Sequence, residues 1–229
     1  MRLTVIGRYG PYPAPGGACS CYLLNAGGMN IVMDMGPGSL SGLLKVTDVG
    51  SISAVWISHL HYDHTSDLLP FRYLLEDLGQ RIKVVTHPED TDYYRLLFGH
   101  RNIEVTDAVP GGGLRLGGLD LSFYEMDHTA YDLALRVSDG QKTFVYTGDT
   151  RFTENLFAAG GGADCVLADC AKPDGFSGPH MTVTHAKEIR RRTGARLIAT
   201  HLSPGYSPND DLAGCDGIET AEEGQTYVI

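Results

Sequence analysis

The order of strand-like and helix-like segments predicts a layered α/β fold, in which two sheets pack face to face and helices cover both outer sides. Short apolar and β-branched runs recur along the chain, and most are bounded by Gly, Pro, Asn or Asp, as strands are. Segments with helical spacing of apolar residues lie between groups of these runs. A chain of 229 residues with 42% apolar content can bury a large core. Since no linker divides it, we expect a single domain over 1–229.

Ten runs are predicted to be strands. They are Leu3–Ile6, Tyr22–Asn25, Ile31–Asp34, Ala54–Ser58, Ile82–Thr86, Leu119–Met126, Leu133–Val137, Thr143–Thr147, Cys165–Ala168 and Leu197–Thr200. Three segments are predicted to be helices, namely Thr65–Leu78, Pro88–Phe98 and Thr182–Thr193. A glycine follows each of them, as is common after a helix, and Pro88 suits a first helical position.

The composition argues against several classes of function. A net charge of −10 disfavours broad contact with a nucleic-acid backbone, and Arg190-Arg191-Arg192 falls in a predicted helix as a solvated face. The opening MRLTVIGRYG turns polar too early for a signal peptide or a membrane span, so we expect a cytoplasmic protein without a membrane partner. The five cysteines form no CxxC pair and are expected to be reduced, buried thiols.

The segment WISHLHYDH (56–64) carries three histidines and an aspartate within six residues, directly after an apolar run. Residues two apart in an extended segment project the same way, so His59 and His61 can reach one ion. Asp63 and His64 follow where the chain turns into a helix, and they can reach a second ion nearby. Imidazole and carboxylate suit zinc, and also manganese or iron, whereas the absence of thiolates argues against a purely structural zinc site.

Further ligands are expected from three polar groups that follow predicted strands: Asp127-His128-Thr129, Thr147-Gly148-Asp149-Thr150 and Thr200-His201-Leu202-Ser203. Each group alone is a weak signal, because a lone His or a Gly-Asp turn is usually structural. Their repeated placement at strand ends is typical of a functional site. A carboxylate such as Asp149 suits a bridging position between two ions about 3.5–4 Å apart.

These motifs, in this order from His59 to Pro204, resemble those of the metallo-β-lactamase superfamily, and HLHYDH is the most specific of them. The resemblance implies a four-layer αββα sandwich and two divalent metal ions. It also implies a ligand set by position, with the first ion held by His59, His61 and His128, the second by Asp63, His64 and His201, and Asp149 bridging.

At several positions this chain departs from the motifs of particular branches of the superfamily, and these departures argue against the activities of those branches. The diiron flavoprotein branch has an acidic residue at the position of His61, and zinc β-lactamases usually have Cys at the position of Asp149. Glyoxalase-II-like and lactonase members carry His-Thr-Pro-Gly where this chain reads His128-Thr129-Ala130-Tyr131. Redox, lactamase and lactonase activities are therefore disfavoured.

The segment GPHMTVTHAKEIRRRTGARLIATHLSP is similar to the RNase Z and cyclic-phosphodiesterase branch. In that branch a histidine matching His180 contacts the phosphate and can protonate the leaving oxygen, as an acid near the leaving group should. Asp169 stands where RNase Z has a glutamate partner for this histidine, although a structural role for Asp169 at a strand end is equally open. With Asp63 beside the metals, these residues form the expected catalytic set, in which a metal-bound hydroxide attacks phosphorus.

Only twenty residues separate His128 from Asp149, enough for two strands and a tight turn at Ser138-Asp139-Gly140 but not for the tRNA-binding arm of RNase Z. We therefore expect a small or cyclic phosphodiester as substrate, with tRNA disfavoured and a homodimer left open. Three alternatives remain: a hydrolase of thioesters, lactones or other esters, an RNA-processing nuclease, and a non-catalytic metal-stabilised binding protein. The loop Gly10–Gly17 and Tyr206 could border the substrate, whereas His87, His100 and His185 are expected to be structural or solvated.

Overall fold

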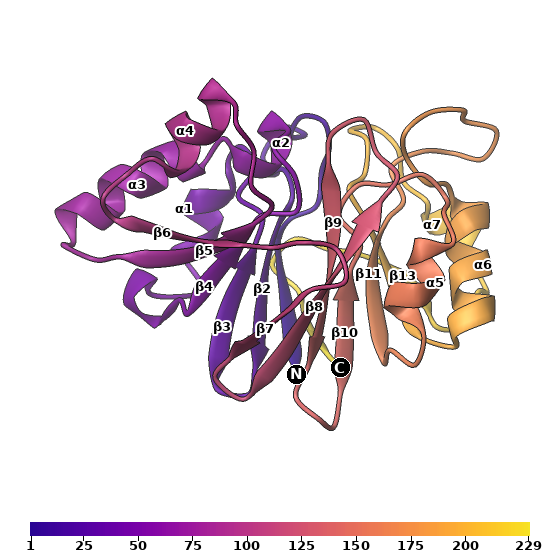
Figure 1. Cartoon of the computed structure of the whole chain (residues 1–229). Helices are drawn as coiled ribbons and strands as arrows, with labels where there is room; N and C mark the ends of the chain where they lie inside the picture. The colour runs from indigo at the N-terminus through magenta and orange to yellow at the C-terminus, as the bar shows by residue number, and fades with distance from the viewer.

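The computed structural model describes residues 1–229 and contains two seven-stranded sheets packed face to face (Figure 1). The first sheet has the order β14-β1-β2-β3-β4-β5-β6 and the second the order β13-β12-β11-β10-β9-β8-β7. The strands of the first sheet are β1 (Arg2–Gly7), β2 (Cys21–Ala26), β3 (Met29–Met33), β4 (Ala54–Trp56), β5 (Ile82–Thr86), β6 (Ile103–Asp107) and β14 (Thr226–Val228). Those of the second are β7 (Gly113–Leu116), β8 (Leu119–Met126), β9 (Asp132–Ser138), β10 (Thr143–Tyr146), β11 (Cys165–Asp169), β12 (Arg196–Thr200) and β13 (Ile218–Thr220).

Helices cover the outer face of each sheet. The first sheet carries α1 (Ser39–Leu43), α2 (Tyr62–Thr65), α3 (Leu68–Asp77), α4 (Asp92–Phe98) and a 3-10 turn at Val49–Ser51, and the second carries α5 (Asn155–Gly160), α6 (Val183–Thr193) and α7 (Asn209–Leu212). Figure 1 shows α1 to α4 on one side and α5 to α7 on the other, with both chain ends at the foot of the strands. None of these helices combines the length and the apolar character needed to cross a membrane.

Three apolar clusters fill the spaces between the layers. The largest fills the space between the sheets, where Trp56 of the first sheet stacks on Phe123 of the second with ring centroids 5.2 Å apart. A second cluster lies between the first sheet and its helices and includes Phe71 of α3. A third lies between the second sheet and α5 to α7 and includes Ile189 of α6. The predicted αββα sandwich is therefore confirmed.

All ten predicted strands are present, but two helix predictions are wrong in their bounds. The helix expected over Thr65–Leu78 begins at Tyr62 and is interrupted, because the backbone N–H of Asp67 donates to Met35 O (2.9 Å) and leaves the helical ladder. The helix expected from Pro88 begins only at Asp92, where the Thr91 hydroxyl accepts from the N–H of Tyr94. The third helix follows Thr182 and ends at Gly194 as predicted.

The direction of the strands brings several strand ends to one edge of the sandwich. In the first sheet β3, β4, β5 and β6 are parallel, and in the second β10, β11, β12 and β13 are parallel. The two sheets are joined at this edge by a hydrogen bond from Leu133 N to Ser58 O (3.1 Å). Because carboxyl ends of parallel strands lie on the same side, the polar segments that follow them meet here.

Candidate metal centre

The segment after β4 supplies the first part of the site. His59 lies on extended chain beyond β4, and His61 is the N-cap residue of α2, with φ −65° and ψ 150°. The next turn is helical and carries Asp63 and His64, both buried. The chain thus changes from extended to helical within the motif, as its spacing predicts, and all four side chains face the same edge of the sandwich.

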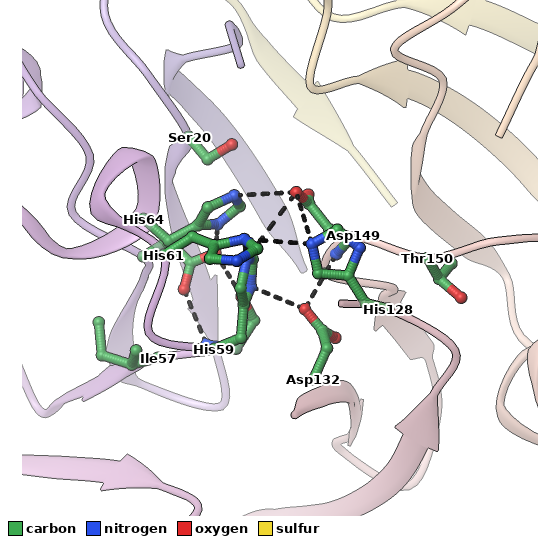
Figure 2. A network of polar contacts seen from close by, with 12 residues as sticks. Ser20, Ile57, His59, His61, His64, His128, Asp132, Asp149 and Thr150 are labelled. Atoms are coloured by element: carbon green, nitrogen blue, oxygen red, sulfur yellow. Dashed lines mark hydrogen bonds and ion pairs between the residues drawn. The ribbon is translucent and has the colours of Figure 1, made fainter. Parts of the chain in front are cut away.

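One group of ligand atoms comes from His59, His61, His128 and Asp149. Nε2 of His59 is 3.0 Å from Nδ1 of His61, which is 3.2 Å from Nε2 of His128. Nitrogens bound to a tetrahedral zinc at about 2.0–2.1 Å lie about 3.3 Å from one another, close to these separations. Figure 2 shows these rings gathered at one point, with Asp149 beside them.

A second group consists of Asp63, His64, Asp149 and His201. Oδ2 of Asp149 is 3.1 Å from Nε2 of His201 and 3.4 Å from Nε2 of His64. It is also 3.8 Å from Nε2 of His128 in the first group. Asp149 is the one residue that belongs to both groups and so has the position of a bridging ligand.

The ring nitrogens that face away from the centre have their own partners. Nδ1 of His59 lies 2.7 Å from Asp132 and Nδ1 of His64 lies 2.7 Å from Asp34. Nδ1 of His128 donates to the carbonyl of Pro179 (3.1 Å), and Nδ1 of His201 is hydrogen-bonded to Ser20 (3.1 Å). These contacts fix the four rings so that Nε2 faces the centre, which is the orientation that metal binding requires.

Asp34 and Asp132 were missed by the sequence reasoning. Both side chains are fully buried, and Asp34 also accepts from the hydroxyls of Ser58 (2.9 Å) and Tyr146 (2.6 Å). Asp34 directly follows β3, so the rule that polar residues after strands form the site could have found it. Asp132 begins β9 instead, and nothing in its local sequence distinguishes it.

The electrostatics of the centre favour a bound cation. Burial lowers the pKa of His128 to about 4 and holds the pKa values of His59 and His201 well below the usual range, so these rings are neutral, as imidazoles that bind a metal must be. Burial raises the pKa of Asp149 to about 6. Burial also opposes protonation of His64, but Asp149 and neighbouring carboxylates hold its pKa well above its usual value.

Two buried polar atoms at the centre, Nε2 of His64 and Oδ1 of Asp149, have no hydrogen-bond partner. Buried polar atoms are rarely left without one. Together with the facing ring nitrogens, they show that the residues present fit a divalent metal centre, and its oxygen and nitrogen donors suit zinc, manganese or iron.

His180 lies next to this centre. Its ring is stacked on that of His201 at 5.1 Å and lies 5.3 Å from that of His128. Nδ1 of His180 donates to Oδ2 of Asp169 at 3.0 Å and is 3.9 Å from Oδ2 of Asp149. Asp169 is fully buried at the end of β11, and its other oxygen accepts from Ala171 N. The structure thus brings His180 and Asp169 into direct contact.

The remaining residues named from the sequence differ in how close they lie to the centre. Gly10, at the start of the Gly10–Gly17 loop, packs so closely on the His201 ring that a Cβ there would overlap it. Tyr206 packs against the apolar cluster beneath α6 with its hydroxyl buried, instead of standing free at the mouth. His87 pairs with Glu89, and His185 accepts from Thr182 N at the start of α6. Neither belongs to the metal groups, and nor does His100.

The sandwich and the His/Asp centre together define a metallo-hydrolase architecture, and sequence comparison agrees with it. A family model described as the Beta-lactamase superfamily domain matches residues 29–202, more than half of the chain. The chain belongs to the metallo-β-lactamase superfamily.

Within the superfamily the chain is similar to the "Probable metallo-hydrolase YhfI" of Bacillus subtilis, with 30% identity over 222 residues that cover 93% of this chain and 91% of that one. The crystal structure of YhfI superposes with a TM-score of 0.91 at 27% identity, covering 99% of this chain and 98% of that one. Ribonuclease Z of Methanosarcina acetivorans is 22% identical over 93% of this chain and 90% of its own. The short form of human tRNase Z shares the fold, with a TM-score of 0.83 at 18% identity over 100% and 99% of the two chains.

Proposed function

We propose that the protein is a dinuclear metal-dependent phosphodiesterase that acts on small or cyclic phosphodiesters. One observation carries the choice of phosphorus chemistry: a hydrogen-bonded His180–Asp169 pair lies directly against the two ligand groups. Hydrolysis of a phosphodiester expels an alkoxide, which needs a proton, and His180 lies beside the ligand groups where it could supply that proton. The relationship to Ribonuclease Z supports the same class of reaction.

In this reaction each residue of the site would have a separate role. Asp149 lies between the two ligand groups, and Asp63 adds a carboxylate to the second, so both can hold divalent ions. Two such ions, when bound, would activate water and neutralise charge that develops on the phosphoryl oxygens. His180 would bind the phosphoryl group and deliver the proton to the leaving oxygen. Asp169 keeps Nδ1 of His180 as the donor, which leaves Nε2 for the substrate.

The hairpin between His128 and Asp149 supports a small substrate. It consists of β9 and β10, and its tight turn is closed by Asp139, whose carboxylate accepts from Gln141 N and Lys142 N. No extra arm is inserted between His128 and Asp149. A chain with a net charge of −10 also offers little attraction to a long RNA backbone.

The test is hydrolysis of chromogenic phosphodiesters by the protein loaded with zinc or manganese. We expect activity that chelation abolishes and added metal restores. With an alkyl phosphodiester, whose leaving alkoxide needs a proton, His180→Ala should lower turnover by about 10²–10⁴-fold while the metal content, measured by elemental analysis, stays unchanged. Loss of metal from His180→Ala would show that His180 is a ligand and not an acid.

A substrate panel separates the alternatives. Hydrolysis of thioesters or lactones with no diester cleaved would replace the phosphodiesterase proposal by the ester-hydrolase alternative. Cleavage of precursor tRNA in preference to small diesters would favour a nuclease. A loaded protein inert to every substrate would point to a binding role.

A further inference from the structure

Lys172 is a cation without an anionic partner in an acidic protein. Its Nζ donates to the hydroxyl of Ser203 (2.7 Å) and lies 5.3 Å from the centre of the Phe176 ring, and it forms no ion pair. Lys142, in contrast, is paired with Asp164 (2.8 Å). An unpaired ammonium held in place by a hydroxyl retains two free donors.

The position of Lys172 is set by three segments of the site. It lies three residues after Asp169, at the end of β11, and its anchor Ser203 lies two residues after His201, at the end of β12. A β-bridge pairs Lys172 with Thr182, two residues beyond His180. Lys172 therefore lies on the His180 side of the centre.

We propose that Lys172 binds an anionic group carried by the leaving portion of the substrate. The assignment rests on the proposed function, in which His180 protonates the leaving oxygen on this side. A diester whose leaving group bears its own phosphate or carboxylate would place that charge against the free donors of Lys172. An ammonium suits this role because it is a point charge on a flexible stem that can follow groups of different geometry.

A matched pair of substrates tests the assignment. Methyl 4-carboxyphenyl phosphate and methyl 4-carbamoylphenyl phosphate have leaving groups of nearly the same shape, and only the first leaving group bears a carboxylate. We expect the metal-loaded protein to prefer the carboxylate in kcat/KM by about tenfold, as for a charge-assisted hydrogen bond. Lys172→Met should abolish the preference, and Lys172→Arg should keep most of it. Lys187→Met, which removes an unpaired, exposed lysine of α6, is the control and should change nothing.

A binding measurement separates this assignment from the proposed reaction. Calorimetric titration with 4-hydroxybenzoate and 4-hydroxybenzamide should show tighter binding of the acid, and Lys172→Met should remove the difference. If no diester is cleaved but this difference appears and is lost in Lys172→Met, the proposed function fails and the Lys172 assignment stands. Equal binding of the two compounds by the unaltered protein, or a preference that persists in Lys172→Met, would overturn the assignment.

Discussion

At the scale of single residues, two buried carboxylates decide how well the candidate ligands are held. Asp132 orients His59 in the first group, and Asp34 orients His64 in the second (Figure 2 draws the contact between Asp132 and His59). Such outer partners typically contribute 10–100-fold in metal affinity. We expect Asp132→Asn to weaken one metal equivalent by about this factor and Asp34→Asn to weaken the other, as measured by competition with a chromogenic chelator. Unchanged affinity in both variants would contradict the role given to these carboxylates.

The close approach of Gly10 to His201 gives a second prediction at this scale. A Cβ on Gly10 would overlap the His201 ring, so Gly10→Ala should displace this ligand and lower the metal content toward one equivalent. Gly118→Ala is the control, because a Cβ at Gly118 meets no atom within 4 Å. Elemental analysis that finds two equivalents in both variants would show that the packing of Gly10 does not hold His201.

At the scale of elements, local spacing predicts the structure of one continuous segment. It fails where contacts with residues far away in the sequence determine that structure. The four ligand candidates from His59 to His64 could be predicted because a single strand-to-helix turn positions them. The break between α2 and α3 could not, since it depends on the contact of Asp67 with Met35. The missed strands β6, β7, β13 and β14 are short and lie at or near sheet edges, where partly exposed residues leave a weak pattern.

The start of α6 offers a test of a histidine that lies outside the metal groups. Nδ1 of His185 accepts from Thr182 N (3.2 Å), and its ring stacks on Phe152 at 4.9 Å. Losing a helix cap costs about 1 kcal/mol, so His185→Ala should lower the unfolding midpoint by about 2–4 °C. Metal content should not change. A stable variant that has lost metal would mean that His185 acts at the centre instead.

At the scale of the whole molecule, the candidate ligands come from both sheets. His59 and His64 follow β4 of the first sheet, whereas His128, Asp149 and His201 follow β8, β10 and β12 of the second. The sequence predicts the sandwich and the repeated placement of the candidate ligands at strand ends, because each of these residues follows a recognisable strand. Burial of Asp34 and Asp132 beneath the ligands becomes visible only when the sheets are packed together. Cytoplasmic location and a homodimer stay predictions.

Bound ions would join the two halves of the sandwich and should stabilise it. A ligand at 100 times its dissociation constant adds about 2.7 kcal/mol. For a chain of this size, that free energy corresponds to about 5–10 °C in the unfolding midpoint. Thermal unfolding of the stripped protein should therefore occur lower by this amount and recover when zinc is added. Equal midpoints with and without metal would count against ligands that link the sheets.

The central claim is that two divalent ions act together in phosphodiester hydrolysis. The most direct test is turnover of bis-p-nitrophenyl phosphate while zinc is added back to the stripped protein. Activity should rise to a plateau at two equivalents of zinc per chain. A plateau at one equivalent, or no hydrolysis at any zinc concentration, would contradict the claim.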